Sequence, residues 1–305
     1  MSELTDFFPA TGGGGGGGAS LTGTTTYRAL LIGGGANGIL GNATYGAGGP
    51  GAGAFFETIL PFFSDITYNV VIAAAEGTTT FETAIGKFYA PPGGAGRTNA
   101  TGLNGASGGG GNAHSSTMQY GGNPFIYTAK GNQLVAANTA TPSGQGFATA
   151  DWVRGPGVQT LGFPGGYANS NYRSGGGGGA GGPGQANGGY SAATGGAGRT
   201  TDIINTTTAT PASVGDVNSG EVWFGGGGYG GRLSYIVDNA GSGPGTGGGG
   251  QSSNSAGGVS NGDSGCAILK VPTSTNFTQT GASTYTDQGM TAIIWTGAGT
   301  FQINS

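Results

Sequence analysis

The chain has 305 residues, of which 75 are glycine and 13 are proline, and it carries a net charge of −4 with only 7% charged residues. Nine Lys and Arg residues are too few for the clustered cations that nucleic-acid binding requires, and no stretch approaches the ~20 apolar residues of a membrane-spanning helix. A single cysteine excludes an internal disulfide and Cys-rich zinc sites. Because charge is low and aromatic residues reach 10%, the composition is unlike that of a disordered chain, and we expect it to fold.

Residues 1–25 are expected to be an N-terminal anchor or assembly segment. They contain Phe7 and Phe8, then the glycine run Gly12–Gly18 and a threonine-rich exit. A flexible tail is one interpretation. The other is a peptide that docks onto another subunit, with Phe7 and Phe8 as candidate anchor residues. The first residues lack the basic and apolar regions of a secretory signal.

Residues 26–92 are predicted to form the first part of a β-sandwich. The run Tyr27–Ile32 is almost continuously apolar, which is typical of a strand buried on both faces. Further β segments are predicted at Ala54–Leu60, Ile66–Ala73 and Thr79–Ala90.

Residues 93–262 are glycine-rich, with runs such as Gly108–Gly111 and Gly175–Gly179. Two inserts with less glycine, 120–163 and 200–224, are predicted to be exposed. Glycine is about 1 kcal/mol less favourable than alanine in a helix, and no ten-residue window is free of Gly, Pro or β-branched residues. We therefore predict no helix in this chain.

Extended glycine can form a left-handed helix with three residues per turn and no internal hydrogen bonds. Each buried N–H and C=O group then needs a partner on a neighbouring segment. Side-by-side packing of several such helices supplies these partners, and a β framework that holds both ends reduces the entropic cost of ordering glycine. The glycine-rich region is therefore expected to be a bundle of polyglycine II helices.

Residues 263–305 are predicted to close the sandwich. The segment Cys266–Val271 has the pattern of a buried strand, and Cys266 is expected to be a small buried apolar residue. The last unit, Met290–Ile303, is predicted to be a hairpin with its turn at Thr296–Gly299.

Several phrases of the chain resemble the glycine-rich domain family of phage tail and appendage proteins and of bacterial surface proteins. These phrases are YRALLIGGG at Tyr27–Gly35, GGPGAGA at Gly48–Ala54, ITYNVVIAAAEG at Ile66–Gly77 and GDSGCAILKVP at Gly262–Pro272. The run GLNGASGGGG at Gly102–Gly111 is also similar to the glycine-rich region of the anaplastic lymphoma kinase and leukocyte tyrosine kinase receptors. The chain has no kinase segment, which excludes a receptor kinase.

The resemblance covers roughly residues 26–272 and implies both a fold and a function. The implied fold is all-β: a jelly-roll, tumour-necrosis-factor-like β-sandwich interrupted by a bundle of polyglycine II helices. The implied function is a non-enzymatic phage virion protein, a tail-fibre or appendage adhesin for host attachment. The alternatives are a capsid decoration or head-fibre protein and a secreted bacterial surface or matrix protein.

The aromatic residues of the inserts are the candidates for a binding face. Trp, Tyr and Arg are frequent interface anchors, and binding residues commonly lie in loops on a rigid scaffold. The candidate receptor-binding or partner-binding residues are Phe125, Tyr127, Trp152, Arg154 and Trp223. Alternatively, Phe125, Tyr127 and Trp152 cap the glycine bundle as a small core.

No enzymatic site is predicted, and no cofactor or metal is expected. The match of Gly33–Gly38 to a dinucleotide motif lacks the helix that must follow it, and the only histidine, His114, has no carboxylate neighbour in sequence. The expected partners are other virion proteins, a host receptor of protein or glycan type, and further copies of the chain in a trimer. The expected location is the virion surface, or alternatively the cell exterior.

Overall fold

A computed structural model describes residues 23–41, 47–98, 100–112, 121–122, 125–128, 133–136, 158–168, 174–186, 193–231, 248–249 and 259–305. Within these ranges the chain is mostly β. The main strands are β1 (Thr25–Ile32), β2 (Phe55–Phe62), β3 (Tyr68–Val71), β4 (Thr79–Thr83), β5 (Gly86–Ala90), β12 (Cys266–Pro272), β13 (Phe277–Asp287) and β14 (Met290–Ile303). Smaller elements are β6 (Phe125–Thr128), β7 (Gln133–Ala136), β8 (Val158–Thr160), β9 (Arg199–Thr200), α2 (Thr206–Ala212), β10 (Asp216–Asn218) and β11 (Glu221–Phe224).

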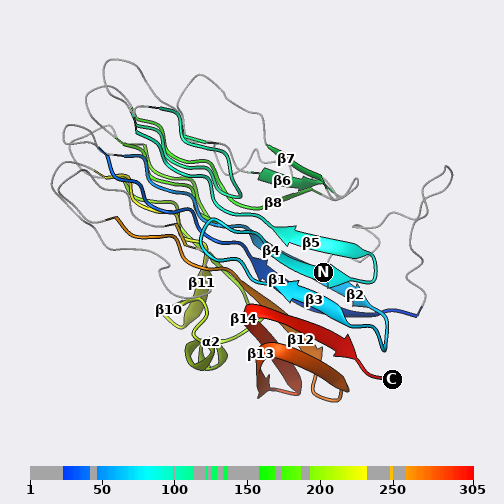
Figure 1. Cartoon of the computed structure of the whole chain (residues 1–305). Coiled ribbons are helices and arrows are strands. Elements are labelled where there is room, and N and C mark those ends of the chain that lie inside the picture. The colour runs from blue at the N-terminus through cyan, green and yellow to red at the C-terminus, as the bar shows by residue number, and fades with distance from the viewer. Residues whose placement is uncertain are drawn as a thin grey trace, which may run out of the picture.

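The main strands form one 8-stranded antiparallel sheet in the order β2-β1-β12-β14-β3-β4-β5, with β13 also paired to β14 (Figure 1). The first half of β14 pairs with β12 and its second half with β3, while β13 follows almost the whole length of β14. The sheet therefore folds over into two layers that share β14. The core between these layers is aromatic and includes Phe56, Phe62, Phe81, Trp295 and Phe301.

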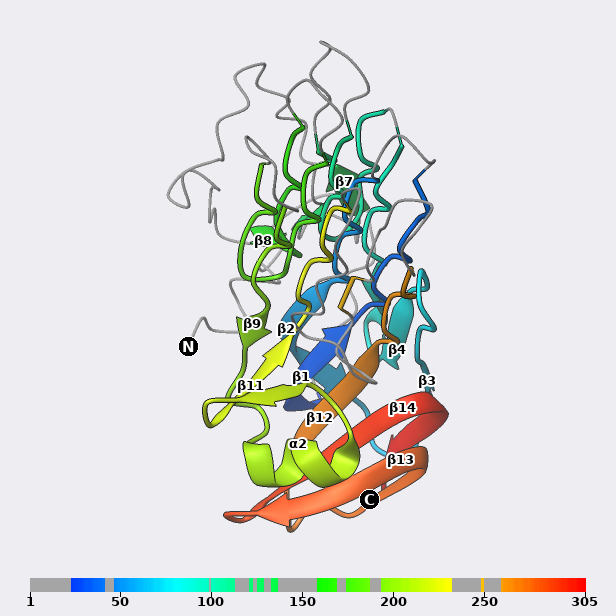
Figure 2. The same ribbon diagram turned by 90° about the vertical axis from the view of Figure 1, so that its left-hand side faces the viewer.

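A third layer covers the other face of β1, β2 and β12. It consists of α2 and the small sheet β10-β11-β9, which lie together beside β12 in Figure 2. A second apolar core fills the interface and includes Leu30, Ile32, Phe55, Ile268, Ile204, Val222 and Phe224. Because β1, β2 and β12 are buried on both faces, their sequences are nearly continuous apolar runs.

The predicted β-sandwich strands are confirmed in position. The segments Tyr27–Ile32, Ala54–Leu60, Ile66–Ala73 and Cys266–Val271 contain or overlap β1, β2, β3 and β12. Thr79–Ala90 is a hairpin of two strands, β4 and β5, rather than one strand.

Two predictions were wrong. Helix α2 exists because Asn205 caps its N-terminus, Ser213 ends it in the left-handed conformation, and Thr208 and Ala209 are buried against the second core. These tertiary contacts outweigh the poor helix propensity of TTTATPA. The predicted turn at Thr296–Gly299 is also absent, because β14 continues through it and the hairpin turn lies between β13 and β14.

The glycine segments run side by side away from β1, β5 and β12 (Figure 1), and they are joined by main-chain hydrogen bonds. The central segment, 175–180, shows the pattern most clearly. Its N–H groups donate to carbonyl groups of three neighbouring segments at 2.7–3.0 Å. Gly175 donates to Gly111 and Gly178 to Gly108; Gly176 donates to Gln185 and Gly179 to Gly182. On the third side, Gly177 donates to Gly228 and Ala180 to Gly225. Residues three apart therefore donate to the same neighbour.

The carbonyl groups of segment 175–180 follow the same period and reach three further segments. The Gly175 carbonyl accepts from the Gly49 N–H, and the Gly178 carbonyl accepts from the Ala52 N–H. On a second side, Gly176 accepts from Gly166 and Gly179 from Phe163. On the third side, Gly177 accepts from Gly196. The period recurs elsewhere in the bundle: Gly48, Gly51 and Ala54 donate to Arg97, Gly94 and Pro91. Each described N–H of the central segment is thus satisfied laterally, as a buried main chain requires.

Glycine is required at the tightest of these contacts. A Cβ atom on Gly177 would lie 1.9 Å from the carbonyl oxygen of Pro50, and one on Gly110 would lie 2.1 Å from that of Gly175. Such distances are far inside van der Waals contact with rigid main chain. The glycine content of the chain is therefore a steric consequence of how closely its segments pack.

Candidate functional site

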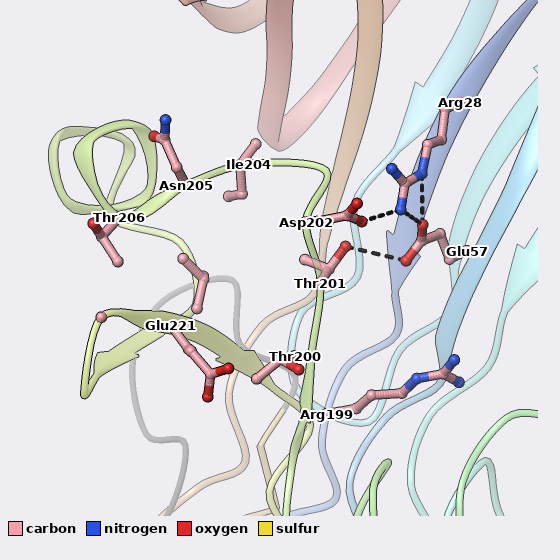
Figure 3. A pocket seen from close by; sticks show the side chains of 12 residues that line it. Arg28, Glu57, Arg199, Thr200, Thr201, Asp202, Ile204, Asn205, Thr206 and Glu221 are labelled. Atoms are coloured by element: carbon pink, nitrogen blue, oxygen red, sulfur yellow. Dashed lines mark hydrogen bonds and ion pairs between the residues drawn. The ribbon is translucent and has the colours of Figure 1, made fainter.

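A groove of about 760 Å³ lies where the third layer meets the edge of β1 and β2 (Figure 3). Arg28 and Glu57 line one side of it, the segment after β9 crosses it, and the turn between β10 and β11 borders it at Gly220 and Glu221. Ile204 and Val222 form its apolar floor, and their side chains belong to the second core.

Arg28 is the centre of the polar cluster in this groove. Its Nε donates to Glu57 Oε1 at 2.7 Å, and its Nη2 forms ion pairs with both Glu57 and Asp202 (Figure 3). The Thr201 hydroxyl donates to the other Glu57 oxygen at 3.1 Å. Since Arg28 and Glu57 belong to the main sheet and Asp202 to the third layer, the cluster ties these two layers together.

The electrostatics of the cluster favour the ionised forms of Arg28 and Asp202. The hydrogen bond that Arg28 donates to Asp202 is the main cause that raises the pKa of Arg28, and burial opposes it. The same bond holds the pKa of Asp202 below its ordinary value of 3.8. Both carboxylates are engaged by one guanidinium, so the cluster is suited to fixing geometry rather than to transferring protons.

Asn205 connects the groove to helix α2. Its Oδ1 accepts from the Thr208 N–H at 3.0 Å as the helix N-cap, and its Nδ2 donates to Asp287 Oδ2 at 2.6 Å at the end of β13. One amide side chain therefore starts the helix and holds it against the main sheet.

The solvent-facing side of the β9–β11 sheet adjoins the groove, and we call it the Trp223 face. Trp223 pairs with Thr200 on β9 and with Asp216 on β10, and Glu221 pairs with Asn218. Since side chains alternate along a strand, these five residues share one face. Val222 and Phe224 point the other way and are buried. Thr200 and Glu221 line the groove as well, so the face and the groove share an edge, although Trp223 itself does not line the groove.

Trp223 is half-buried, and in the described part of the chain no aromatic ring contacts it. Asn218 and Glu221 are exposed. The face thus offers an accessible indole bordered by carboxylate, amide and hydroxyl groups.

The other residues predicted for binding are not brought together with Trp223. Phe125 and Tyr127 lie on β6, which pairs with β7 and β8 in a separate small sheet beside the glycine bundle (Figure 1). Trp152, Arg154, Phe7, Phe8 and His114 lie outside the described residues. The insert 200–224, predicted to be exposed, is a packed layer with its apolar half buried.

The groove itself was missed by the sequence analysis, although a signal was present. Arg28 and Glu57 are opposite charges that interrupt two apolar segments, Tyr27–Ile32 and Ala54–Leu60. Charged residues are almost never fully buried unless they are paired, and neighbouring strands place such residues within reach of each other. Asp202 carried no comparable signal, because it is separated from Arg28 by most of the chain.

No metal or thiol chemistry is apparent in the described residues. They contain no group of three or more His, Cys, Asp or Glu side chains arranged to hold a metal ion. Cys266 is buried in the second core, and burial raises the pKa of its thiol well above the ordinary value. A thiol in this setting is an unreactive apolar side chain.

Comparison with protein-family models, with curated proteins and with solved structures gave no match to this chain. Within the ranges that the structure describes, no helix has both the length and the apolar character needed to cross a membrane.

Proposed function

We propose that the glycine segments are polyglycine II helices and that the chain is a rigid, non-enzymatic display protein. The supporting observation is the three-residue period of the lateral hydrogen bonds around segment 175–180, with three segments that accept from it and three that donate to it. A helix with three residues per turn directs its polar groups in this way. We further propose that the two-layered sheet beside the bundle is a jelly-roll sandwich.

The far end of the bundle is the proposed display surface. There, Asn112 forms a β-bridge with Ser174, the Ser174 hydroxyl donates to the Gly231 carbonyl at 2.7 Å, and the Gly231 N–H donates to Ala47 at 2.9 Å. Each of these residues adjoins a connecting segment, so several connections start and end at one place. The glycine lattice has few side chains with which to recognise a partner, and the connections supply them.

We propose that this protein is a phage tail-fibre or appendage adhesin that attaches the virion to its host. The proposal combines the bundle geometry with the resemblance of the β phrases to phage appendage proteins. Residues 1–25 would anchor the chain to other virion proteins through Phe7 and Phe8, and a trimer is the proposed assembly. A capsid decoration or head-fibre protein is the second candidate, and a secreted bacterial surface or matrix protein is the third.

The adhesin proposal is tested with particles that carry Trp152→Ala and Arg154→Ala together. We expect slower adsorption to host cells with an unchanged number of copies per particle, because these side chains lie in the insert 120–163, which we propose supplies recognition side chains together with the connections at the far end. Tyr89→Ala, on an outer strand of the main sheet, is the control and should adsorb normally. Reduced copy number with normal adsorption per copy would instead support the decoration protein. Unchanged adsorption at full copy number would contradict both.

A further inference from the structure

We propose that the Trp223 face and the adjoining groove form a binding site for neutral oligosaccharides. This site is distinct from the far end of the glycine bundle: β11 lies beside β1 and β12, near the base of the bundle (Figure 2). The proposal goes beyond attachment through the display surface, because the isolated protein would bind saccharide here whatever its place in a virion.

The Trp223 face has the chemistry that a saccharide requires. A sugar ring presents a flat patch of C–H groups, and the electron-rich face of an indole attracts such weakly positive groups. Sugar hydroxyls are donors and acceptors, and the groups that border Trp223 match them: carboxylates of Asp216 and Glu221, the amide of Asn218 and the hydroxyl of Thr200. In ligand sites, a small number of placed polar groups beside aromatic side chains fixes the orientation of the ligand.

The site is held in place by buried residues on the same strands. Val222 and Phe224 alternate with the ligand-facing residues and are buried in the second core, which fixes the strand that carries Trp223. The Arg28 cluster fixes the segment after β9 through Asp202. A preorganised surface loses little entropy on binding, which matters for weakly held ligands such as saccharides.

The site is large enough for more than one sugar unit. Thr200 and Glu221 belong both to the Trp223 face and to the groove of about 760 Å³. A pocket of this size is in the range that holds small ligands. A ligand with several sugar units could therefore stack one ring on Trp223 and reach the groove across the shared edge at Thr200 and Glu221.

Charge selects the class of saccharide. The groove and the face carry four carboxylates, Glu57, Asp202, Asp216 and Glu221, against two guanidinium groups, Arg28 and Arg199, and the whole chain has a net charge of −4. Like charges repel anionic ligands, so sulfated or uronic-acid polymers are disfavoured. Nucleobases also stack on indole, but their phosphates would meet the same carboxylates. Neutral hexose or N-acetylhexosamine oligomers fit best.

The test uses the purified full-length chain and four probes: maltohexaose, cellohexaose, the N-acetylglucosamine tetramer and a thymidine oligonucleotide. Binding is followed by isothermal titration and by saturation-transfer NMR, at ligand concentrations up to about 10 mM, where a millimolar complex is largely formed. The variants are Trp223→Ala, Trp223→Phe and Glu221→Gln. Tyr89→Ala is the matched control, because Tyr89 is a partly exposed aromatic residue on an outer strand of the opposite layer.

We expect at least one neutral saccharide to bind the wild-type chain. Trp223→Ala should lower its affinity about tenfold or more, Trp223→Phe should retain most of the binding, and Glu221→Gln should weaken it a few-fold, whereas Tyr89→Ala should leave it unchanged. Circular dichroism shows whether each variant is folded. If Trp223→Ala does not fold, the saccharide affinities of Trp223→Phe and Glu221→Gln are compared with the wild type in its place. Absence of binding by all three saccharides, equal binding by wild type and Trp223→Ala, or preferential binding of the oligonucleotide would overturn the proposal. None of these results bears on adsorption through the far end of the bundle.

Discussion

Individual glycines in the bundle differ in the space around them, and this difference decides which of them accept a side chain. Gly177 lies in the central segment, and the three atoms nearest to a Cβ atom added there would all be main-chain atoms of Pro50 and Gly49. Gly182 belongs to an adjacent segment, yet a Cβ atom placed on it would meet nothing closer than the Ala197 nitrogen at 3.5 Å. Main chain held by hydrogen bonds on several sides has no room to yield.

Gly177→Ala is therefore expected to destabilise the protein by about 3 kcal/mol or more, because the added methyl group separates at least two segments of the bundle. Gly182→Ala is the matched control and should change stability by less than about 1 kcal/mol. Denaturant unfolding followed by far-UV circular dichroism measures both. Similar losses for the two variants would contradict close packing around the central segment.

Asp202 gives the groove a defined pH response. Its pKa in the folded protein is lowered by Arg28, so the ion pair stabilises the folded state above the unfolded-state value near 3.8. This contribution disappears as the pH falls through the folded-state pKa. Because 82% of the Asp202 side chain is exposed, solvent screening keeps the effect below about 1 kcal/mol.

Asp202→Asn should consequently lower the free energy of unfolding at pH 7, and this difference from wild type should shrink toward zero at about pH 3. Unfolding curves of both proteins at the two pH values measure it. A difference that is the same at pH 3 as at pH 7 would show that Asp202 acts through packing or hydrogen bonding and not through its charge.

Among the structural elements, helix α2 depends on its N-cap more than on its own sequence. The helix has seven residues, including four threonines and one proline that favour other conformations. Asn205 supplies both the cap and the hydrogen bond to Asp287. The third layer, which carries the proposed saccharide site, is therefore held in part by this one side chain.

Asn205→Ala is expected to cost about 1–2 kcal/mol of stability, since it removes a cap and a side-chain hydrogen bond. Asn205→Ser keeps a capping oxygen but is too short to reach Asp287, and its loss should be intermediate. Chemical denaturation ranks the three proteins. If alanine and serine destabilise equally, the cap contributes nothing and only the contact with Asp287 matters.

The accuracy of the sequence analysis differed between kinds of element. Strands buried on both faces, such as β1 and β12, were recognised because their apolar runs leave no other interpretation. Strand β13 was not recognised: it lies at an edge of the sheet, is rich in threonine and exposes most of its side chains. Helix α2 was excluded on propensity, but its formation is decided by a cap and by burial, which a local window does not contain.

The candidate site was predictable only in part. Trp223 was selected from its residue type, and the structure places it on an accessible face. The groove beside it depends on Asp202 reaching Arg28 across 174 positions of the sequence. This contact forms only because the third layer packs against β1, and a local sequence pattern cannot predict such a long-range contact.

At the scale of the whole molecule, the sandwich and the bundle depend on each other. Glycine loses more conformational entropy on ordering than any other residue, so isolated glycine segments would not hold this arrangement. Strands β1, β2 and β5 lead directly into or out of glycine segments and fix their ends (Figure 1). The result is a stiff body in which main-chain hydrogen bonds replace the side-chain core of an ordinary domain.

The most direct test of this arrangement is residue-resolved amide hydrogen exchange of Gly175–Gly179. Their N–H groups donate at 2.8–3.0 Å to neighbouring segments, although they belong to no helix or strand. We predict that they exchange as slowly as the amides of β12 and far more slowly than Gly220, which lies in the exposed turn between β10 and β11. Exchange of Gly175–Gly179 at the rate of Gly220, while β12 remains protected, would show that the segments form no hydrogen-bonded bundle and would contradict the proposed scaffold.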